Sequence, residues 1–257
     1  MYPSTIDTSG MDLATLSTRA PDNFNKTHTK ALTQKLTEEL DELQNKLYAE
    51  SKWSLLVILQ GMDASGKDGA IKDVFRAVNP QGVRVKSFKA PTEEELAHDF
   101  LWRIHKHTPP KGKIQIFNRS HYEDVLITRV LGLTNDETAN QRFQLINGFE
   151  RLLQERGTQI LKLYLHISEA EQLERFQDRL NDPRKHWKYN PDDLKTASNW
   201  SLYRKYYQEV FENCSPEIPW TIVPSDQNWY KKYIIANKIV ETLRGLNMKY
   251  PGLDESV

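Results

Sequence analysis

The residues best suited to chemistry form a glycine-rich stretch, Gly61-Met-Asp-Ala-Ser-Gly66-Lys67-Asp68. Its spacing, G-x-x-x-x-G-K, is that of a phosphate-binding loop, and it stands between an apolar run and a helical pattern, as such a loop requires. Glycines allow successive backbone N–H groups to turn into one cavity, where the N-terminus of the next helix adds positive charge. Lys67 would then face the terminal phosphates of a ligand. The stretch predicts an enzyme that acts on phosphate groups.

Two carboxylates depart from the common form of this loop. The residue after the lysine is normally Ser or Thr, whose hydroxyl binds Mg²⁺, but here it is Asp68. Asp63 lies inside the loop, where it would be repelled by phosphate unless it held a metal or took a proton. We expect Asp63 to bind Mg²⁺, or to act as a base for the attacking oxygen; the alternative is a carboxylate that only caps the loop. The residues expected to bind nucleotide or phosphate here are Gly61, Ala64, Ser65, Gly66, Asp68 and Gly69.

A second polar cluster follows another apolar run. Asn118 and Arg119 come at the carboxyl end of that run, where ligands of open α/β sheets are bound. Arg119 suits a bidentate phosphate contact, and Glu123 and Asp124 lie one helical turn further along. We expect Asn118, Glu123 and Asp124 to bind nucleotide or phosphate, and Glu123 to share the metal with Asp63. The alternative is a surface arginine beside helix-capping acids.

A basic segment late in the chain could close over the site. It runs from Arg175 to Lys188 and contains Arg179, Arg184, Lys185 and Trp187. Kinase lids exclude water and bring cations to the reacting phosphates, so we expect a lid at about residues 175–195. A loop with lysines and a tryptophan could equally bind RNA.

The surrounding sequence predicts an α/β protein with a mainly parallel sheet and helices on both faces, because short apolar runs alternate with helical patterns. The predicted strands are Leu55–Gln60, Val83–Phe88, Lys113–Asn118, Gln159–Ile167 and Trp220–Val223. The predicted helices are Lys30–Glu50, Lys67–Val78, Glu93–His107, Tyr122–Leu131, Glu137–Glu155, Glu169–Arg179, Leu194–Glu212 and Trp229–Leu246. We expect residues 1–27 to form an irregular N-terminal arm and residues 28–257 to form one domain.

Charge and composition narrow the class of partner. The chain carries 35 Lys+Arg and 35 Asp+Glu, so its net charge is zero, yet no acid occurs from Phe100 to Tyr122. This unevenness favours a focused anion site over a nucleic-acid or membrane surface. Cys214 is the single cysteine and cannot form an internal disulfide. The first residues lack a signal-peptide pattern, and no apolar run approaches the roughly 20 residues of a membrane span, so we expect a cytoplasmic protein.

Four sequence blocks together resemble the second polyphosphate kinase family, the polyphosphate:nucleotide phosphotransferases. The blocks are GMDASGKDGAIK (61–72), NPQGVRVKSFKAPT (79–92), FNRSHYEDVLITRV (117–130) and RLNDPRKHWKYNPDD (179–193). The resemblance implies a three-layer α/β/α P-loop kinase-like fold with a five-stranded parallel sheet and a lid. It also implies transfer of a phosphoryl group between inorganic polyphosphate and a nucleoside mono- or diphosphate, with Mg²⁺ or its substitute Mn²⁺, in a homo-oligomer (dimer or tetramer).

The resemblance also implies roles for single residues. Asp63, Lys67 and Arg119 would be catalytic, with Asp63 assisting the metal. Asn118 and Glu123 resemble the subgroup that accepts both mono- and diphosphates, whereas members restricted to diphosphates tend to have Asp and Asn there. The residues expected along the polyphosphate path are Lys72, Lys89, Arg179, Lys185 and Lys188.

Two other functions remain compatible with the same motifs. An ATP-dependent small-molecule or nucleoside monophosphate kinase shares the loop and the lid. A non-catalytic P-loop module that binds RNA or polyphosphate is the alternative from another class, and Asp68 in place of Ser or Thr is its best support.

Overall fold

A computed structural model describes residues 12–188 and 199–252 of the chain. Five strands, all paired in parallel, form one sheet in the order β2-β3-β1-β4-β5. Their bounds are β1 Ser54–Gln60, β2 Val83–Ser87, β3 Ile114–Asn118, β4 Thr158–His166 and β5 Trp220–Pro224. The predicted α/β class and the five-stranded parallel sheet are confirmed.

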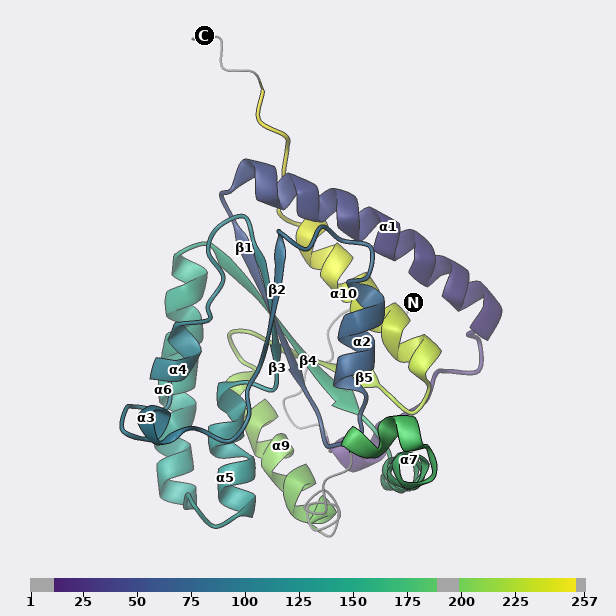
Figure 1. The fold of residues 1–257 in the computed structure, drawn as a ribbon. Coiled ribbons are helices and arrows are strands. Elements are labelled where there is room, and N and C mark those ends of the chain that lie inside the picture. Colours follow the sequence, from purple (N-terminus) through teal and green to yellow (C-terminus); the bar gives the residue numbers. More distant parts are fainter. Residues whose placement is uncertain (1–11, 189–198, 253–257) are drawn as a thin grey trace.

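Helices cover both faces of this sheet (Figure 1). One face packs on α1 Lys26–Glu50, α2 Lys67–Val74 and α10 Asn228–Arg244; the other packs on α6 Asp136–Glu155 and α9 Trp200–Cys214. Alternate residues of β1 serve the two cores: Leu55, Val57 and Leu59 face the first group of helices, and Leu56 and Ile58 the second. This alternation follows from the two-residue period of a strand. A strand that serves two cores is apolar on both faces, as Leu55–Leu59 are.

Two predicted helices are interrupted. The segment predicted as Glu93–His107 forms two short helices, α3 Glu93–Leu96 and α4 Trp102–His105. Asp99 causes the break, because its Oδ1 accepts hydrogen bonds from the N–H groups of Leu101 and Trp102 and so starts a new turn. The segment predicted as Tyr122–Leu131 is likewise divided into η2 His121–Val125, a 3₁₀ helix, and α5 Ile127–Val130.

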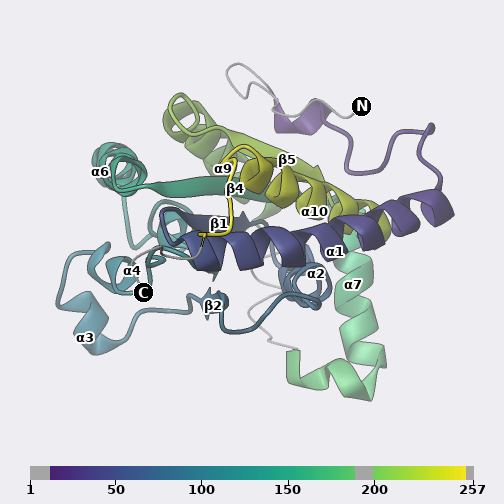
Figure 2. The same ribbon diagram turned by 90° about the horizontal axis from the view of Figure 1, so that it is seen from above.

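The N-terminal segment packs on the domain. Helix α1 begins at Lys26, earlier than predicted, because Asn25 caps it by accepting from the N–H groups of Thr27 and His28. Before it lies a 3₁₀ turn, η1 Leu13–Thr15, with Leu13 buried in the core. Helix α1 crosses α10 in both views (Figures 1 and 2), so its apolar side is covered by its own chain.

The predicted lid begins on a helix that extends away from the sheet. Helix α7 Glu169–Asn181 is followed by η3 Pro183–Lys188 at its far end (Figure 2). Residues 189–198, which include the rest of the predicted lid and the start of the helix predicted at Leu194–Glu212, lie outside the described residues, as does the side chain of Lys188. In the part of the chain that the structure describes, no helix has the length and apolarity needed to span a membrane.

Candidate active site

The site lies where the strand order reverses. Strand β1 has β3 on one side and β4 on the other, so the chains leaving its carboxyl end and that of β3 diverge around a crevice. Two contacts fix these ends together: the Arg119 N–H donates to Leu59 O at 3.0 Å, and Gln60 Nε2 donates to Ser120 Oγ at 3.0 Å. The phosphate loop and Arg119 are therefore neighbours, as predicted.

Side chains from several helices bind the carbonyl oxygens of the loop one after another. Lys67 Nζ donates to Gly61 O at 2.7 Å and to Met62 O at 3.2 Å. The next three carbonyl oxygens each accept one hydrogen bond at 2.8 Å. Gln172 Nε2 donates to Asp63 O, Arg175 Nη1 to Ala64 O and Lys231 Nζ to Ser65 O. In a trans peptide the N–H points opposite to the C=O, so the peptides whose carbonyls bind Gln172, Arg175 and Lys231 direct their N–H groups away from these three side chains. The Ser65 N–H is the exception, since it closes the turn on Met62 O at 3.2 Å.

Lys67 is buried, and neither of its two hydrogen-bond acceptors is a carboxylate. Burial, and then the nearby Arg119, lower the pKa of Lys67 to about 8. A buried cation whose hydrogen-bond partners are carbonyl oxygens is stabilised by an incoming anion. The loop therefore has the electrostatics of a phosphate site.

Gly66 occupies a position that other residues fit poorly. Its φ is +89°, and a Cβ there would lie 2.2 Å from Lys231 Nζ. We predict that Gly66→Ala destabilises the protein by about 1–2 kcal/mol through the left-handed backbone alone, and that it lowers activity by displacing the lysine. Gly69→Ala is the matched comparison, because Gly69 lies in α2 with nothing within 4 Å of the added methyl.

Thermal unfolding of the two variants checks this prediction. Gly69→Ala should raise stability by about 0.5–1 kcal/mol, the usual gain in a helix interior. Equal melting temperatures for the two alanine variants would contradict the assigned geometry of Gly66.

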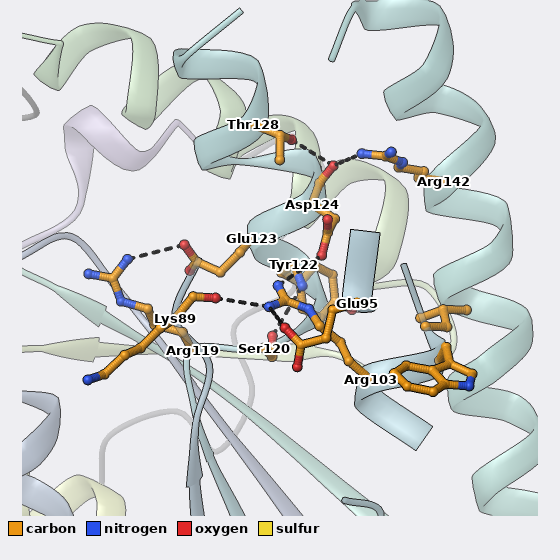
Figure 3. A network of polar contacts seen from close by, with 12 residues as sticks. Lys89, Glu95, Arg103, Arg119, Ser120, Tyr122, Glu123, Asp124, Thr128 and Arg142 are labelled. Carbon is orange, nitrogen blue, oxygen red and sulfur yellow. Dashed lines mark hydrogen bonds and ion pairs between the residues drawn. The ribbon is translucent and has the colours of Figure 1, made fainter. Parts of the chain in front are cut away.

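Arg119 joins the two acids predicted to hold the metal. Its Nη2 forms an ion pair with Asp63, and its Nη1 donates to Glu123 Oε2 at 3.3 Å (Figure 3 shows the latter contact). Glu123, together with Asp63, raises the pKa of Arg119 above its usual value. Arg119 and Ala64 both adopt left-handed backbone, with φ of 63° and 61°. Such conformations are uncommon outside glycine and gather at functional sites.

The donor set suits a metal that takes most of its ligands from phosphate and water. Within residues 12–188 and 199–252, no group of three or more His, Cys, Asp and Glu side chains is arranged to hold an ion. Asp63 and Glu123, however, contact the same guanidinium, so the two carboxylates lie near one another. Mg²⁺ is commonly bound by one or two carboxylates together with substrate phosphates. The residues fit such an ion.

A pocket opens beside Asp63, Arg119 and Glu123. Helix α9 contributes Trp200, Tyr203 and Tyr207 to its lining, and these face the polar residues. Tyr207 is buried and its hydroxyl donates to Gln60 Oε1 at 3.4 Å. Aromatic rings and charged groups therefore share the lining of this pocket, which suits a ligand with an apolar and a charged part.

Other predicted residues take part less directly. Asn118 Nδ2 donates to Asp68 Oδ1 at 2.7 Å, which ties β3 to the start of α2. Asp124 is buried beside Arg103, whose Nη2 lies 3.6 Å from Asp124 Oδ2, and burial raises the pKa of Asp124. Asp124 does not line the described pocket. The contact that the structure shows for Asp124 is with Arg103, and its role in binding nucleotide or phosphate stays a prediction.

Arg103 connects that acid to the segment that carries Lys89. Its Nη1 donates to Lys89 O at 2.9 Å and to Glu95 Oε2 at 3.4 Å (Figure 3). Glu95 and Thr92 form a capping box at the start of α3. The Lys89 side chain is exposed, and so are Gly69 and Lys72 on α2. The exposed lysines are available to a long anion.

The lid cations lie apart from the pocket. Lys185 is half-exposed, 3.8 Å from both Asp178 and Asp182, and Arg184 pairs with Asp182 at 3.1 Å. Arg179 lies over the ring of Phe176 at 5.3 Å. In the described part of the chain, none of these cations lines the pocket beside Asp63.

Three residues that bind the loop carbonyls were missed by the sequence reading: Gln172, Arg175 and Lys231. Arg175 was named only as the first residue of the lid. Its Nη2 also donates to Ser225 O at 2.8 Å and Asp226 O at 3.0 Å, so it connects α7, the loop and the end of β5. No motif marks such residues, because their separation from the loop in sequence exceeds 100 residues.

Comparison with known proteins shows the family to which the chain belongs. The profile of the polyphosphate kinase 2 family matches residues 23–251. An AMP/ADP-polyphosphate phosphotransferase of Meiothermus ruber is 49% identical over 217 residues, which cover 84% of this chain and 81% of that protein. An ADP-polyphosphate phosphotransferase of Rhodopseudomonas palustris is 40% identical over 239 residues, covering 88% and 83%.

A solved structure agrees with the fold. The crystal structure of polyphosphate kinase 2 from Arthrobacter aurescens TC1 superposes with a TM-score of 0.93 at 42% identity, covering 97% of this chain and 90% of that one. The predicted three-layer kinase-like architecture is thereby confirmed. The chain belongs to the polyphosphate kinase 2 family.

Proposed function

We propose that this enzyme transfers a phosphoryl group between inorganic polyphosphate and AMP or ADP. As a family member it is a kinase, and its relatives act on these substrates. The observation that carries the proposal is the loop whose carbonyl oxygens accept hydrogen bonds from side chains. Two of these donors, Lys67 and Lys231, are buried lysines with no carboxylate among their hydrogen-bond partners. This arrangement favours a polyanion.

Acceptance of both AMP and ADP is the finer part of the proposal. It is supported by the pair Asn118 and Glu123, which resembles the subgroup that uses both, and by the name of the Meiothermus ruber relative. The aromatic end of the pocket would bind the nucleoside, and Arg119 at the other end would bind its phosphates.

We further propose that Mg²⁺, for which Mn²⁺ could substitute, is held by Asp63 and Glu123. When bound, the ion would neutralise part of the charge of the phosphate groups. The protein's own groups hold and align the reactants: the loop N–H groups and Lys67 bind the transferred phosphate, and Arg119 binds its oxygens. Phosphoryl transfer has a loose transition state, so alignment and charge neutralisation account for most of the rate.

The polyphosphate path is proposed to follow a series of cations. These are Lys72, Lys89, Arg179, Lys185 and Lys188. A linear polyanion needs a series of point charges more than a shaped pocket. The cytoplasmic location and the homo-oligomer remain predictions.

A coupled assay tests the proposal against its two rivals. Purified protein is incubated with AMP or ADP, Mg²⁺ and polyphosphate, and ADP and ATP are measured. We expect both products without any added nucleoside triphosphate. Transfer only from ATP would indicate the ATP-dependent kinase, and binding without turnover would indicate the non-catalytic module.

A further inference from the structure

Lys231 is a buried lysine beneath the phosphate loop to which no motif assigns a role. It lies in the first turns of α10 and is 1% exposed. Its Nζ donates to Ser65 O at 2.8 Å and to Asn228 Oδ1 at 2.9 Å. A Cβ at Gly66 would lie 2.2 Å from this Nζ, so a side chain there would displace the amine.

The charge of Lys231 is unfavourable in the free protein. Neither of its two hydrogen-bond partners is a carboxylate. The charged groups that act on it are Arg175 and Glu171 on α7, Lys67 on α2 and Lys232 on α10. Glu171 is the one acid of these four, and it accepts a hydrogen bond from Arg175 at 2.8 Å. The N-terminal end of a helix also disfavours a cation.

A hydrogen bond alone does not explain a lysine at this position. Gln172 binds the neighbouring Asp63 O at the same 2.8 Å distance with a neutral amide. A buried cation costs more than a buried amide, so its charge needs a separate reason. An anion on the opposite side of the loop supplies that reason.

We propose that Lys231 is a positioning residue whose buried positive charge, acting through the Ser65–Gly66 peptide, stabilises a phosphate group held by the loop. The ammonium binds the carbonyl of this peptide, and its N–H, on Gly66, points the opposite way. A charge-assisted bond to the carbonyl polarises the peptide and makes that N–H a stronger donor. The inference rests on the proposed function of the loop in binding polyphosphate.

The pKa of Lys231 predicts the direction in which phosphate binding should change with pH. Burial first, and then Arg175, lower the pKa of Lys231 to about 7. A bound anion favours the charged amine, so binding should take up a proton. Affinity for phosphate should therefore fall as the pH rises above about 7, where the amine of the free protein is neutral.

Two variants separate the charge from the hydrogen bond, with tripolyphosphate as the probe. Lys231→Met removes both, and Lys231→Gln keeps a neutral donor for Ser65 O. Binding is measured by calorimetry from about pH 6 to about pH 9 without metal. We expect both variants to bind about tenfold more weakly at the acid end, the scale of one charge-assisted bond, and to lose part of the pH dependence; Lys67 keeps its own share.

Lys238→Met is the matched control. Lys238 is another buried lysine of α10, two turns further on, and its Nζ donates to Glu241 Oε2 at 3.0 Å. This variant should bind as the wild type does at every pH. If Lys231→Gln also binds as the wild type does, the charge has no role and the inference is wrong.

Wild-type protein provides a test that needs no variant. Calorimetry in two buffers of different ionisation enthalpy measures the protons taken up on binding tripolyphosphate. Uptake no greater than that of the free ligand's own titration would overturn the inference, even if both variants failed to fold. Wild-type turnover with polyphosphate is measured in parallel, so failure of the proposed function is detected separately.

Discussion

Asp63→Asn is expected to lower turnover by about a thousandfold or more, on the scale of the several kcal/mol that a catalytic metal contributes. The amide keeps the shape of the carboxylate but cannot bind a hard cation well. The Asp63 backbone carbonyl remains bound by Gln172, so the loop should keep its form. The melting temperature should change little. Steady-state assays with ADP, Mg²⁺ and polyphosphate measure the first effect, and calorimetry the second.

Asp73→Asn serves as the control for this variant. Asp73 lies near the C-terminal end of α2, away from the loop, and forms an ion pair with Lys232 at the surface. Its neutralisation should leave turnover within about twofold, because exposed pairs contribute little. Near-wild-type turnover in Asp63→Asn would remove Asp63 from the mechanism.

Arg119→Lys should have the second-largest effect, a loss of about 10²–10³-fold in kcat, the usual result of removing one preorganised donor at a reacting group. The guanidinium contacts Asp63 and Glu123 through separate nitrogens, and a single ammonium cannot reproduce that geometry. Asp63 and Glu123 would then no longer both be paired with residue 119. Rates at saturating substrate distinguish this loss from weaker binding.

Arg151→Lys is the matched control for the guanidinium. Arg151 binds Glu217 at 2.9 and 2.6 Å through two nitrogens on an exposed face of α6. The same exchange there should leave kcat unchanged. A loss in Arg119→Lys confined to KM would show that Arg119 binds substrate equally in the ground and transition states.

Local sequence patterns were sufficient to predict the sheet and the loop. All five predicted runs became strands. The clearest is β1, which is buried on both faces and apolar from Leu55 to Leu59. The glycine spacing placed the phosphate loop after β1. The same patterns failed where a single polar side chain redirected the chain, as Asp99 does between α3 and α4.

The side chains that bind the loop carbonyls could not be predicted from one sequence. Lys231 and Gln172 look like ordinary helix residues, and only the packing of α7 and α10 against the loop brings them to its carbonyls. Asp124 is a further example. It stands one residue after Glu123 in the 3₁₀ helix η2, and no sequence pattern predicts its contact with Arg103.

The bound carbonyls of residues 61–65 also bear on the entropy of ligand binding. The backbone of this loop is held in shape by donors from α2, α7 and α10 before any ligand arrives. The conformational entropy of ordering the loop is therefore lost during folding, and binding does not incur it a second time. Incoming phosphate groups should meet a receptor of fixed form, whose association depends on desolvation and charge more than on rearrangement of the main chain.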